Sequence, residues 1–328
     1  MRRDARLLGG LAALVAALAL ASLLTGPADA GLRAGIEALW TGEGPLGIVL
    51  REIRAPRTVL AIMVGASLGL SGAALQGYLR NPLAEPGLIG ISASAALGAV
   101  IAIQAGVSAL ALGVPFAALG GALGGVALIL GLAGRRAGGL GLILGGIAVS
   151  ALAGALTALV LNLSPNPFAA YDIMFWTMGS LADRNWGHVL TAAPLMLAGW
   201  VALARAGRDL DALSLGEEAA ASMGVNLARL RLLVVLGAAA AVGAATAVAG
   251  AIGFVGLVVP HLCRLLIGVD HRWLLPFSAG VGACLVVGAD VLGRVVARPG
   301  EIDVGIITAL VGAPFFIHVV RRQKVRAL

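Results

Sequence analysis

Long apolar segments recur along the whole chain, and they constrain its fold more than any other feature. A helix needs ~20 residues to cross the ~30 Å hydrocarbon core of a bilayer. We predict a membrane-spanning helix in each of ten segments: 7–25, 57–79, 88–107, 110–133, 138–162, 187–206, 229–250, 253–268, 273–296 and 305–321. The eighth segment is short and contains Pro260, which predicts a bent or interrupted helix whose freed backbone groups bond to neighbouring helices.

The first segment also has the pattern of a secretory signal. Its apolar run, Leu7–Leu24, is 18 residues long and is followed by Ala28-Asp29-Ala30, which resembles a cleavage site. The apolar core of a signal is usually ~7–15 residues long. Because this run is longer, we interpret it as a retained membrane span.

The composition agrees with a membrane environment. Of the 328 residues, 60% are hydrophobic and 12% are charged, whereas soluble domains carry ~25% charged residues. No single soluble core could bury so much apolar surface, but a bilayer accommodates it. The 48 glycines suit helices whose backbones approach closely in lipid. The sequence therefore predicts an all-α polytopic membrane protein with one transmembrane domain, residues 1–328.

The basic residues indicate how the chain is oriented. Loops rich in arginine and lysine stay on the cytoplasmic side of a membrane. With the N-terminus inside and all ten spans in use, 16 of the 23 basic residues lie on the cytoplasmic side, including those of the tail Arg321–Arg326. Without the eighth span, this tail would lie outside. We therefore expect both termini in the cytoplasm, and we attribute the net charge of +7 to topology and not to a nucleic-acid partner.

Few residues support catalysis or a bound metal. The only lysine is Lys324, so the chain has no phosphate-binding loop of the form G-x-x-x-x-G-K-[ST]. Work driven by ATP would therefore need a partner subunit. His261 and His271 are ten residues apart, with one cysteine and one aspartate between them. This is a poor metal-ligand set, so we expect these histidines to form hydrogen bonds, and we expect no bound metal or cofactor.

An ion-coupled secondary transporter is the alternative reading. Such carriers place carboxylates within their spans, and Asp290 is the only acidic residue clearly within one. Arg294 follows it by four residues, a spacing that favours an ion pair on one helix face. We therefore predict a paired charge and not a proton relay.

Three polar stretches lie between spans: Arg51–Arg57 and Arg294–Asp303 on the outer side, and Leu213–Arg229 on the inner side. The inner stretch is rich in alanine and glutamate, which predicts short helices. Each stretch alone could be an ordinary solvated loop. Together, outer arginines suit an acidic partner, and a helical inner loop suits a cytoplasmic one.

A faint internal repeat relates the two halves of the chain. Arg57 precedes Gly65 by eight residues, as Arg229 precedes Gly237. Five spans in each repeat would give two halves of inverted topology, a common plan for transporters. The high glycine and alanine content could produce the same similarity by chance.

Six stretches carry a resemblance to a known family: Arg54–Ser92, Phe175–Trp186, Gly216–Gly224, Gly250–Pro276, Gly288–Arg294 and Glu301–Phe316. Over nearly its full length, the chain resembles the permease subunits of ATP-binding-cassette (ABC) importers for iron–siderophore complexes, haem and cobalamin. The resemblance implies a type II ABC importer permease fold with ten spans, in a bacterial inner membrane. It also implies a homodimer, two cytoplasmic ATPase subunits that use ATP and Mg, and a periplasmic or extracellular substrate-binding protein. The implied cargo is a metal chelate, with iron–siderophore first, then haem or cobalamin.

The resemblance also implies roles for particular residues. Outer arginines at Arg54, Arg57 and Arg294 would receive acidic side chains of the binding protein, which fits the bidentate pairing of guanidinium with carboxylate. The connection 207–228 would couple to the ATPase through Gly216, Glu217, Glu218, Ala220, Met223 and Gly224. A cytoplasmic gate would lie at Gly138, Gly139, Leu140 and Gly141, where residues with small side chains suit a constriction that moves.

Overall fold

The computed structural model describes residues 2–26, 31–107, 112–134, 139–164, 173, 176–297 and 300–326. Within these ranges every regular element is a helix. The elements are α1 (Arg2–Leu24), α2 (Gly31–Thr41), α3 (Gly44–Ile48), the π-helical turn η1 (Val49–Arg54), α4 (Ala55–Tyr78), the 3-10 turn η2 (Pro86–Ile89), α5 (Ile91–Gln104), α6 (Gly113–Ala133), α7 (Gly139–Asn162), α9 (Trp186–Leu213), α10 (Glu217–Ser222), α11 (Leu227–Ala249), α12 (Val255–Ile267), α13 (His271–Val296) and α14 (Val304–Arg326).

The apolar helices agree with the ten predicted spans. Among the described residues, seven helical segments are long and apolar enough to cross a membrane, and three shorter apolar helices lie at Ile91–Gln104, Val255–Ile267 and Val304–His318. Each of these ten overlaps one predicted segment. The all-α polytopic fold is therefore confirmed.

Some segments that were predicted to lie outside the membrane differ in structure from the prediction. Residues Arg51–Arg57 are helical and form the end of η1 and the first turn of α4, where we expected a loop. Together with α3 they make a continuous apolar segment of 35 residues, Gly44–Tyr78. At 1.5 Å per residue, such a segment is longer than a ~30 Å bilayer core, so one end projects beyond the hydrocarbon. The short helix α2 was also not predicted.

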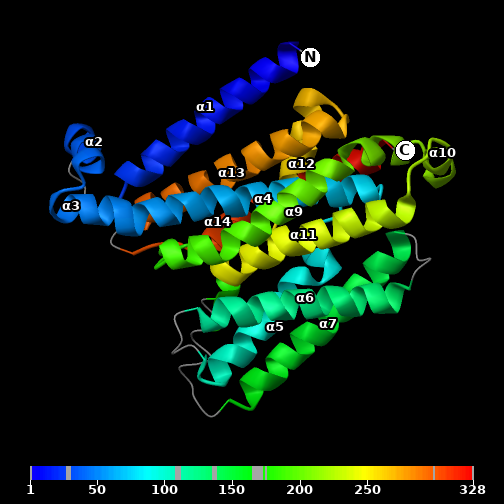
Figure 1. The fold of residues 1–328 in the computed structure, drawn as a ribbon, viewed down its shortest axis with the longest axis horizontal. Coiled ribbons are helices and arrows are strands. Elements are labelled where there is room, and N and C mark those ends of the chain that lie inside the picture. The colour runs from blue at the N-terminus through cyan, green and yellow to red at the C-terminus, as the bar shows by residue number, and fades with distance from the viewer. Residues whose placement is uncertain are drawn as a thin grey trace.

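Helix α4 is the central element of the bundle and is buried along almost its whole length. It packs against α13, α11, α9 and α12, while α5, α6 and α7 form a separate group that joins the rest mainly through α11 (Figure 1). Glycines bring α4 and α13 into backbone contact, because a Cβ on Gly65 would collide with the carbonyl of Gly282, and one on Gly282 with the carbonyl of Gly65. Close approach of this kind explains the high glycine content.

The two ends of the bundle carry different features. Helix α1 begins, and α14 ends, toward the end that also carries α10, whereas α2 and α3 lie at the opposite end (Figure 1). We call these the α10 end and the α2 end. Helices α4 and α11 run in opposite directions (Figure 1), as the inverted repeat requires, although the repeat itself stays a prediction.

Candidate functional site

The α2 end holds a cluster of paired charges, the outer cluster: Arg57, Asp290, Arg294 and Glu301. Arg57 Nη2 lies 2.8 Å from Asp290 Oδ1, and two nitrogens of Arg57 reach the two carboxylate oxygens of Glu301 at 3.1 and 2.8 Å. Arg294 Nη2 lies 2.8 Å from Asp290 Oδ2, which confirms the predicted ion pair four residues apart. The Asp290 side chain is fully buried. Its charge is tolerated there because two guanidinium groups face it.

Two of the predicted docking arginines hold the end of α1. The last carbonyls of a helix have no partner within it. Arg54 Nη1 donates to Leu23 O at 3.0 Å, and Arg294 Nη1 donates to the carbonyls of Ser22 and Thr25 at 2.9 and 2.8 Å. Both arginines are buried. Arg57 instead lies beside the part-exposed Glu301, so it is the predicted docking residue nearest to the surface.

At the α10 end, the predicted coupling residues form a short helix between α9 and α11. Gly216 (φ +111°) precedes α10 and Gly224 (φ +86°) follows it, in backbone conformations that favour glycine. The N–H groups of Gly224 and Val225 donate to the carbonyls of Ala221 and Ala220 at 3.0 and 3.0 Å, which closes the helix as a Schellman motif. The prediction of a short helix in this connection is confirmed.

The side chains of α10 divide into a buried and an exposed set. Ala220 is fully buried, whereas Glu217, Glu218 and Met223 are exposed. Glu217 Oε1 lies 3.8 Å from Arg80 Nη2, which follows α4. An exposed carboxylate pair beside an exposed methionine gives this helix a surface that a cytoplasmic protein could contact. The coupling role stays a prediction.

The predicted gate lies at the start of α7. Gly138 is outside the described residues. A Cβ on Gly139 would lie 3.1 Å from Leu79 Cδ2, so the start of α7 is close to the end of α4. Leu140 is 71% exposed, and Gly141 belongs to the first turn of the same helix. Nothing in this arrangement tests a gating role, which stays a prediction.

Helix α12 runs without interruption through Pro260, so the expected interruption is absent, but the freed backbone group does bond to a neighbouring helix. Proline lacks an N–H, so the carbonyl four residues earlier, that of Gly256, loses its helical partner. Gln76 of α4 supplies the replacement, because its Nε2 donates to the carbonyls of Gly256 and Leu257 at 3.2 and 3.3 Å. Its Oε1 accepts from Arg264 Nη1 at 2.6 Å. Sequence reasoning missed Gln76, although an amide in an apolar span was a signal for it.

Glu85 fixes the start of α12. Phe254 precedes this helix with φ +67°, a conformation that is rare for a residue other than glycine. Its N–H donates to Glu85 Oε1 at 2.7 Å. Burial raises the pKa of the Glu85 carboxyl, and this hydrogen bond opposes the shift only in part. The role of Glu85 could not be predicted from the sequence, because its partner is 169 residues away.

The two histidines at the α10 end make local contacts. His271 Nδ1 lies 2.7 Å from Asp211 Oδ1, and its backbone N–H donates to the same oxygen at 2.8 Å. The ring of His261 packs edge-on against Phe315 with ring centres 5.8 Å apart. The hydrogen-bonding role expected of His271 is therefore confirmed, whereas His261 makes an aromatic contact.

Known proteins resemble this chain along most of its length. A model described as the FecCD transport family matches residues 14–322. The cobalamin import system permease protein BtuC of Halobacterium salinarum is 44% identical over 284 residues, which are 86% of this chain and 75% of that protein. The hemin transport system permease protein HmuU of Yersinia pestis is 40% identical over 327 residues, which are 97% of this chain and 96% of that protein.

A solved structure has the same fold. It is described as an inward-facing conformation of an ABC transporter of the metal-chelate type, and it superposes with a TM-score of 0.85 at 34% sequence identity. The match covers 97% of this chain and 99% of that chain. The type II permease plan expected from the sequence agrees with this likeness.

Proposed function

Because the chain belongs to the FecCD transport family, we propose that it carries a metal chelate across the bacterial inner membrane, with both termini in the cytoplasm. It is a multi-pass membrane permease subunit of an ABC importer, and it works with ATPase and substrate-binding components. The ion-coupled alternative is not favoured. The observation that carries the proposal is the match to a full-length permease, HmuU, over 97% of this chain.

The proposed cargo class comes from the relatives. Their names specify cobalamin, hemin, Fe(3+) dicitrate and ferric enterobactin, all of which are metal chelates. Iron–siderophore is our first choice, followed by haem and cobalamin. The chain itself would bind no cofactor, and the partner ATPase would use ATP and Mg.

The proposed coupling path begins at α10. Its buried Ala220 and its position between α9 and α11 hold it against both long helices. Both of these helices pack against α4. Closure of two ATPase subunits on ATP would therefore move α9 and α11 relative to α4, and would favour one orientation of the pathway over the other. Two copies of this chain would enclose that pathway, with the start of α7 as the gate on the α10 side.

Reconstituted vesicles test this function. The chain and its ATPase subunit would be reconstituted in liposomes, and the binding protein would be added. Uptake would be measured for ⁵⁵Fe-labelled siderophore and, separately, for haem and for cobalamin. We expect uptake only with the binding protein outside and ATP and Mg inside. An ATPase subunit without its nucleotide-binding lysine is the control. Uptake without the ATPase, driven by a proton or sodium gradient, would contradict the proposal.

A further inference from the structure

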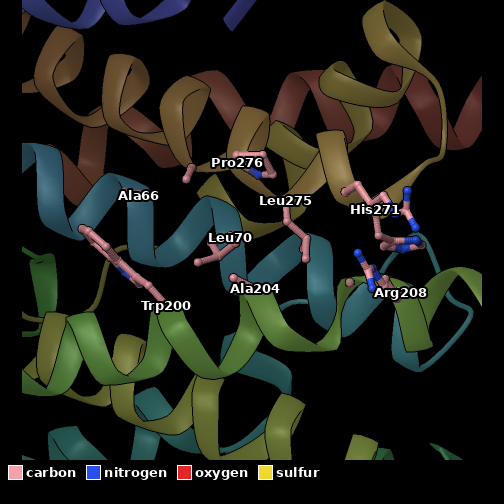
Figure 2. Close-up of a pocket in the computed structure, with 11 residues that line it drawn as sticks. Ala66, Leu70, Trp200, Ala204, Arg208, His271, Leu275 and Pro276 are labelled. Atoms are coloured by element: carbon pink, nitrogen blue, oxygen red, sulfur yellow. The ribbon is translucent and has the colours of Figure 1, made fainter. Parts of the chain in front are cut away.

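A slot opens between α4, α9 and α13 toward the α10 end, and we call it the basic slot. Its volume is about 460 Å³, within the range of ligand sites. Figure 2 shows Trp200 at one end of the slot, Arg208 and His271 at the other, and Leu70 and Ala204 between them. Ala204, Arg208, Arg272 and Pro276 are exposed, so the slot is open along the outside of the bundle.

The middle of the slot is apolar. Its walls there are Leu70 from α4, Ala204 from α9 and Pro276 from α13. Trp200 closes the far end, and its Nε1 donates to Ser67 Oγ at 2.8 Å, so its polar edge is already paired. Trp200 and Arg208 are eight residues apart on one helix, which corresponds to ~12 Å. A hydrocarbon chain fits such a passage better than a polar solute does.

The other end of the slot carries unshared positive charge. In the described part of the chain, no ion pair includes Arg208 or Arg272, although both line the slot. Of the three aspartates nearest in sequence to these arginines, all of which the structure describes, Asp209 forms no ion pair with either of them, and the other two have partners. Asp211 Oδ1 accepts from the backbone and ring nitrogens of His271 at 2.8 and 2.7 Å, and Asp270 Oδ1 accepts from the backbone N–H of Arg272 at 2.9 Å. The two guanidinium groups therefore remain available to an anion.

The depth of the slot matches the layers of a bilayer. Arg208 lies five residues before the end of α9 at Leu213, and Arg272 lies in the first turn of α13. Both are at the end of a long apolar helix, where the headgroups begin. Trp200 lies ~12 Å deeper along α9, at the level of the acyl chains. The basic end of the slot thus lies at the level of the lipid headgroups and its apolar part at the level of the acyl chains, as in a phospholipid.

We propose that the basic slot binds one anionic phospholipid from the leaflet on the α10 side. Its phosphate would lie between Arg208 and Arg272, and the upper part of one acyl chain would run past Leu70, Ala204 and Pro276 toward Trp200. Basic pockets between membrane helices on the cytoplasmic side are suited to anionic headgroups. This lipid would join α9, which leads to α10, with α13. The inference goes beyond the proposed function, since it concerns a component of the membrane and not the cargo.

Brominated lipids test the site, because bromine on an acyl chain quenches nearby tryptophan fluorescence. The purified chain would be placed in nanodiscs of phosphatidylcholine and titrated with brominated phosphatidylglycerol. We expect a saturable component of the quenching. Brominated phosphatidylcholine should not produce this component, and Trp200→Phe should lose most of it. Arg208→Gln with Arg272→Gln should weaken the apparent affinity about thirty-fold, the factor that corresponds to ~1 kcal/mol for each of two arginines.

Matched variants distinguish lipid binding in the slot from a general effect of removing positive charge. Arg205→Gln with Arg229→Gln removes the same charge from exposed residues outside the slot, and it should leave the quenching unchanged. Ala204→Trp fills the slot and keeps both arginines, so it should remove the lipid retained in native mass spectrometry. Equal loss in the Arg205 and Arg229 control would overturn the proposal, as would displacement by inorganic phosphate. A changed oligomeric state in Ala204→Trp with an unchanged lipid count would assign the slot to a second copy of the chain.

Discussion

Arg264 on α12 donates a hydrogen bond of 2.6 Å to the side-chain oxygen of Gln76 on α4. The same amide of Gln76 donates to the carbonyl of Gly256, which Pro260 leaves without a helical partner. One side chain thus bonds both to the carbonyl that Pro260 leaves free and to the half-buried cation of Arg264. The consequence is that α4 and α12 are joined by polar contacts in addition to apolar packing.

Gln76→Leu should therefore destabilise the protein by ~1–3 kcal/mol, because it leaves a buried carbonyl without a donor and Arg264 without this acceptor. Thermal unfolding in detergent measures the effect. A double-mutant cycle with Pro260→Ala provides the control, because alanine at 260 restores an N–H for Gly256. We expect Gln76→Leu to lower the free energy of unfolding less in the Pro260→Ala background than in the wild-type background. An equal decrease in both backgrounds would show that Gln76 does not act through this carbonyl.

Docking of the binding protein is the second prediction. Arg57 is the docking candidate nearest to the surface, but it also neutralises Asp290. A loss of docking in Arg57→Gln could therefore arise from Asp290 alone. We expect Arg57→Gln to weaken association with the binding protein at low salt about tenfold, since a charged pair contributes ~1.5 kcal/mol or more. Surface plasmon resonance with the permease in nanodiscs measures this.

The control for docking keeps the outer cluster neutral. Arg57→Gln with Asp290→Asn removes one charge of each sign, so Arg294 and Glu301 remain balanced. If Arg57 contacts the binding protein, this double variant binds as weakly as Arg57→Gln alone. Recovery of wild-type affinity in the double variant would remove Arg57 from the docking surface and leave it an internal role.

Much of the fold follows from local pattern. The apolar segments predicted the spans because a bilayer demands a fixed length of apolar helix. Pro260 predicted a backbone carbonyl without a helical partner, for a reason internal to its own helix, although the helix itself continues through the proline. The pairing of Asp290 with Arg294 followed from their helical spacing alone. In each case the cause lies within a few neighbouring residues.

The remainder depends on contacts between distant parts of the chain. Arg294 binds carbonyls at the end of α1, 272 residues earlier for Ser22, and no spacing rule connects the two. Glu85 binds the backbone of Phe254 for the same kind of reason. The family resemblance implies a docking role for the outer arginines, and their residue type suits carboxylates, but the burial of Arg54 and Arg294 depends on how α1 packs. Residue type was readable from sequence, and accessibility was not.

Coupling through α10 is the third prediction. Glu217→Arg with Glu218→Arg should reduce stimulation of ATPase activity by the binding protein several-fold, because both carboxylates are exposed where a cytoplasmic subunit would dock. Folding should change little, since the pair of Glu217 with Arg80 is exposed, and exposed ion pairs contribute ~0–1 kcal/mol. ATP hydrolysis by the reconstituted complex is the measurement.

A charge swap distinguishes two explanations of that effect. Arg80→Glu with Glu217→Arg restores the intramolecular pair with reversed sign. If Glu217 acts on the ATPase, the swapped variant stays uncoupled like Glu217→Arg. If it acts only by holding Arg80, the swap restores stimulation, and α10 loses its proposed contact.

The fourth prediction concerns pH and Glu85. Burial raises the pKa of its carboxyl in the folded protein, so the folded state binds this proton more tightly than the unfolded state does. The resulting contribution to stability is fully present below the usual glutamate pKa of ~4.3 and is lost as pH rises through the raised value. Glu85→Gln keeps an oxygen that accepts from the N–H of Phe254 and removes the titration. We therefore expect the melting temperature of Glu85→Gln, minus that of the wild type, to increase as the pH rises from 4.5 to 7.5.

The control is Glu85→Leu, which removes the acceptor. It should melt at a lower temperature than the wild type at every pH, because Phe254 then holds its positive φ without this hydrogen bond. A constant difference between Glu85→Gln and the wild type across that range would show that the carboxyl titrates at its ordinary pKa, and that its burial has no electrostatic consequence.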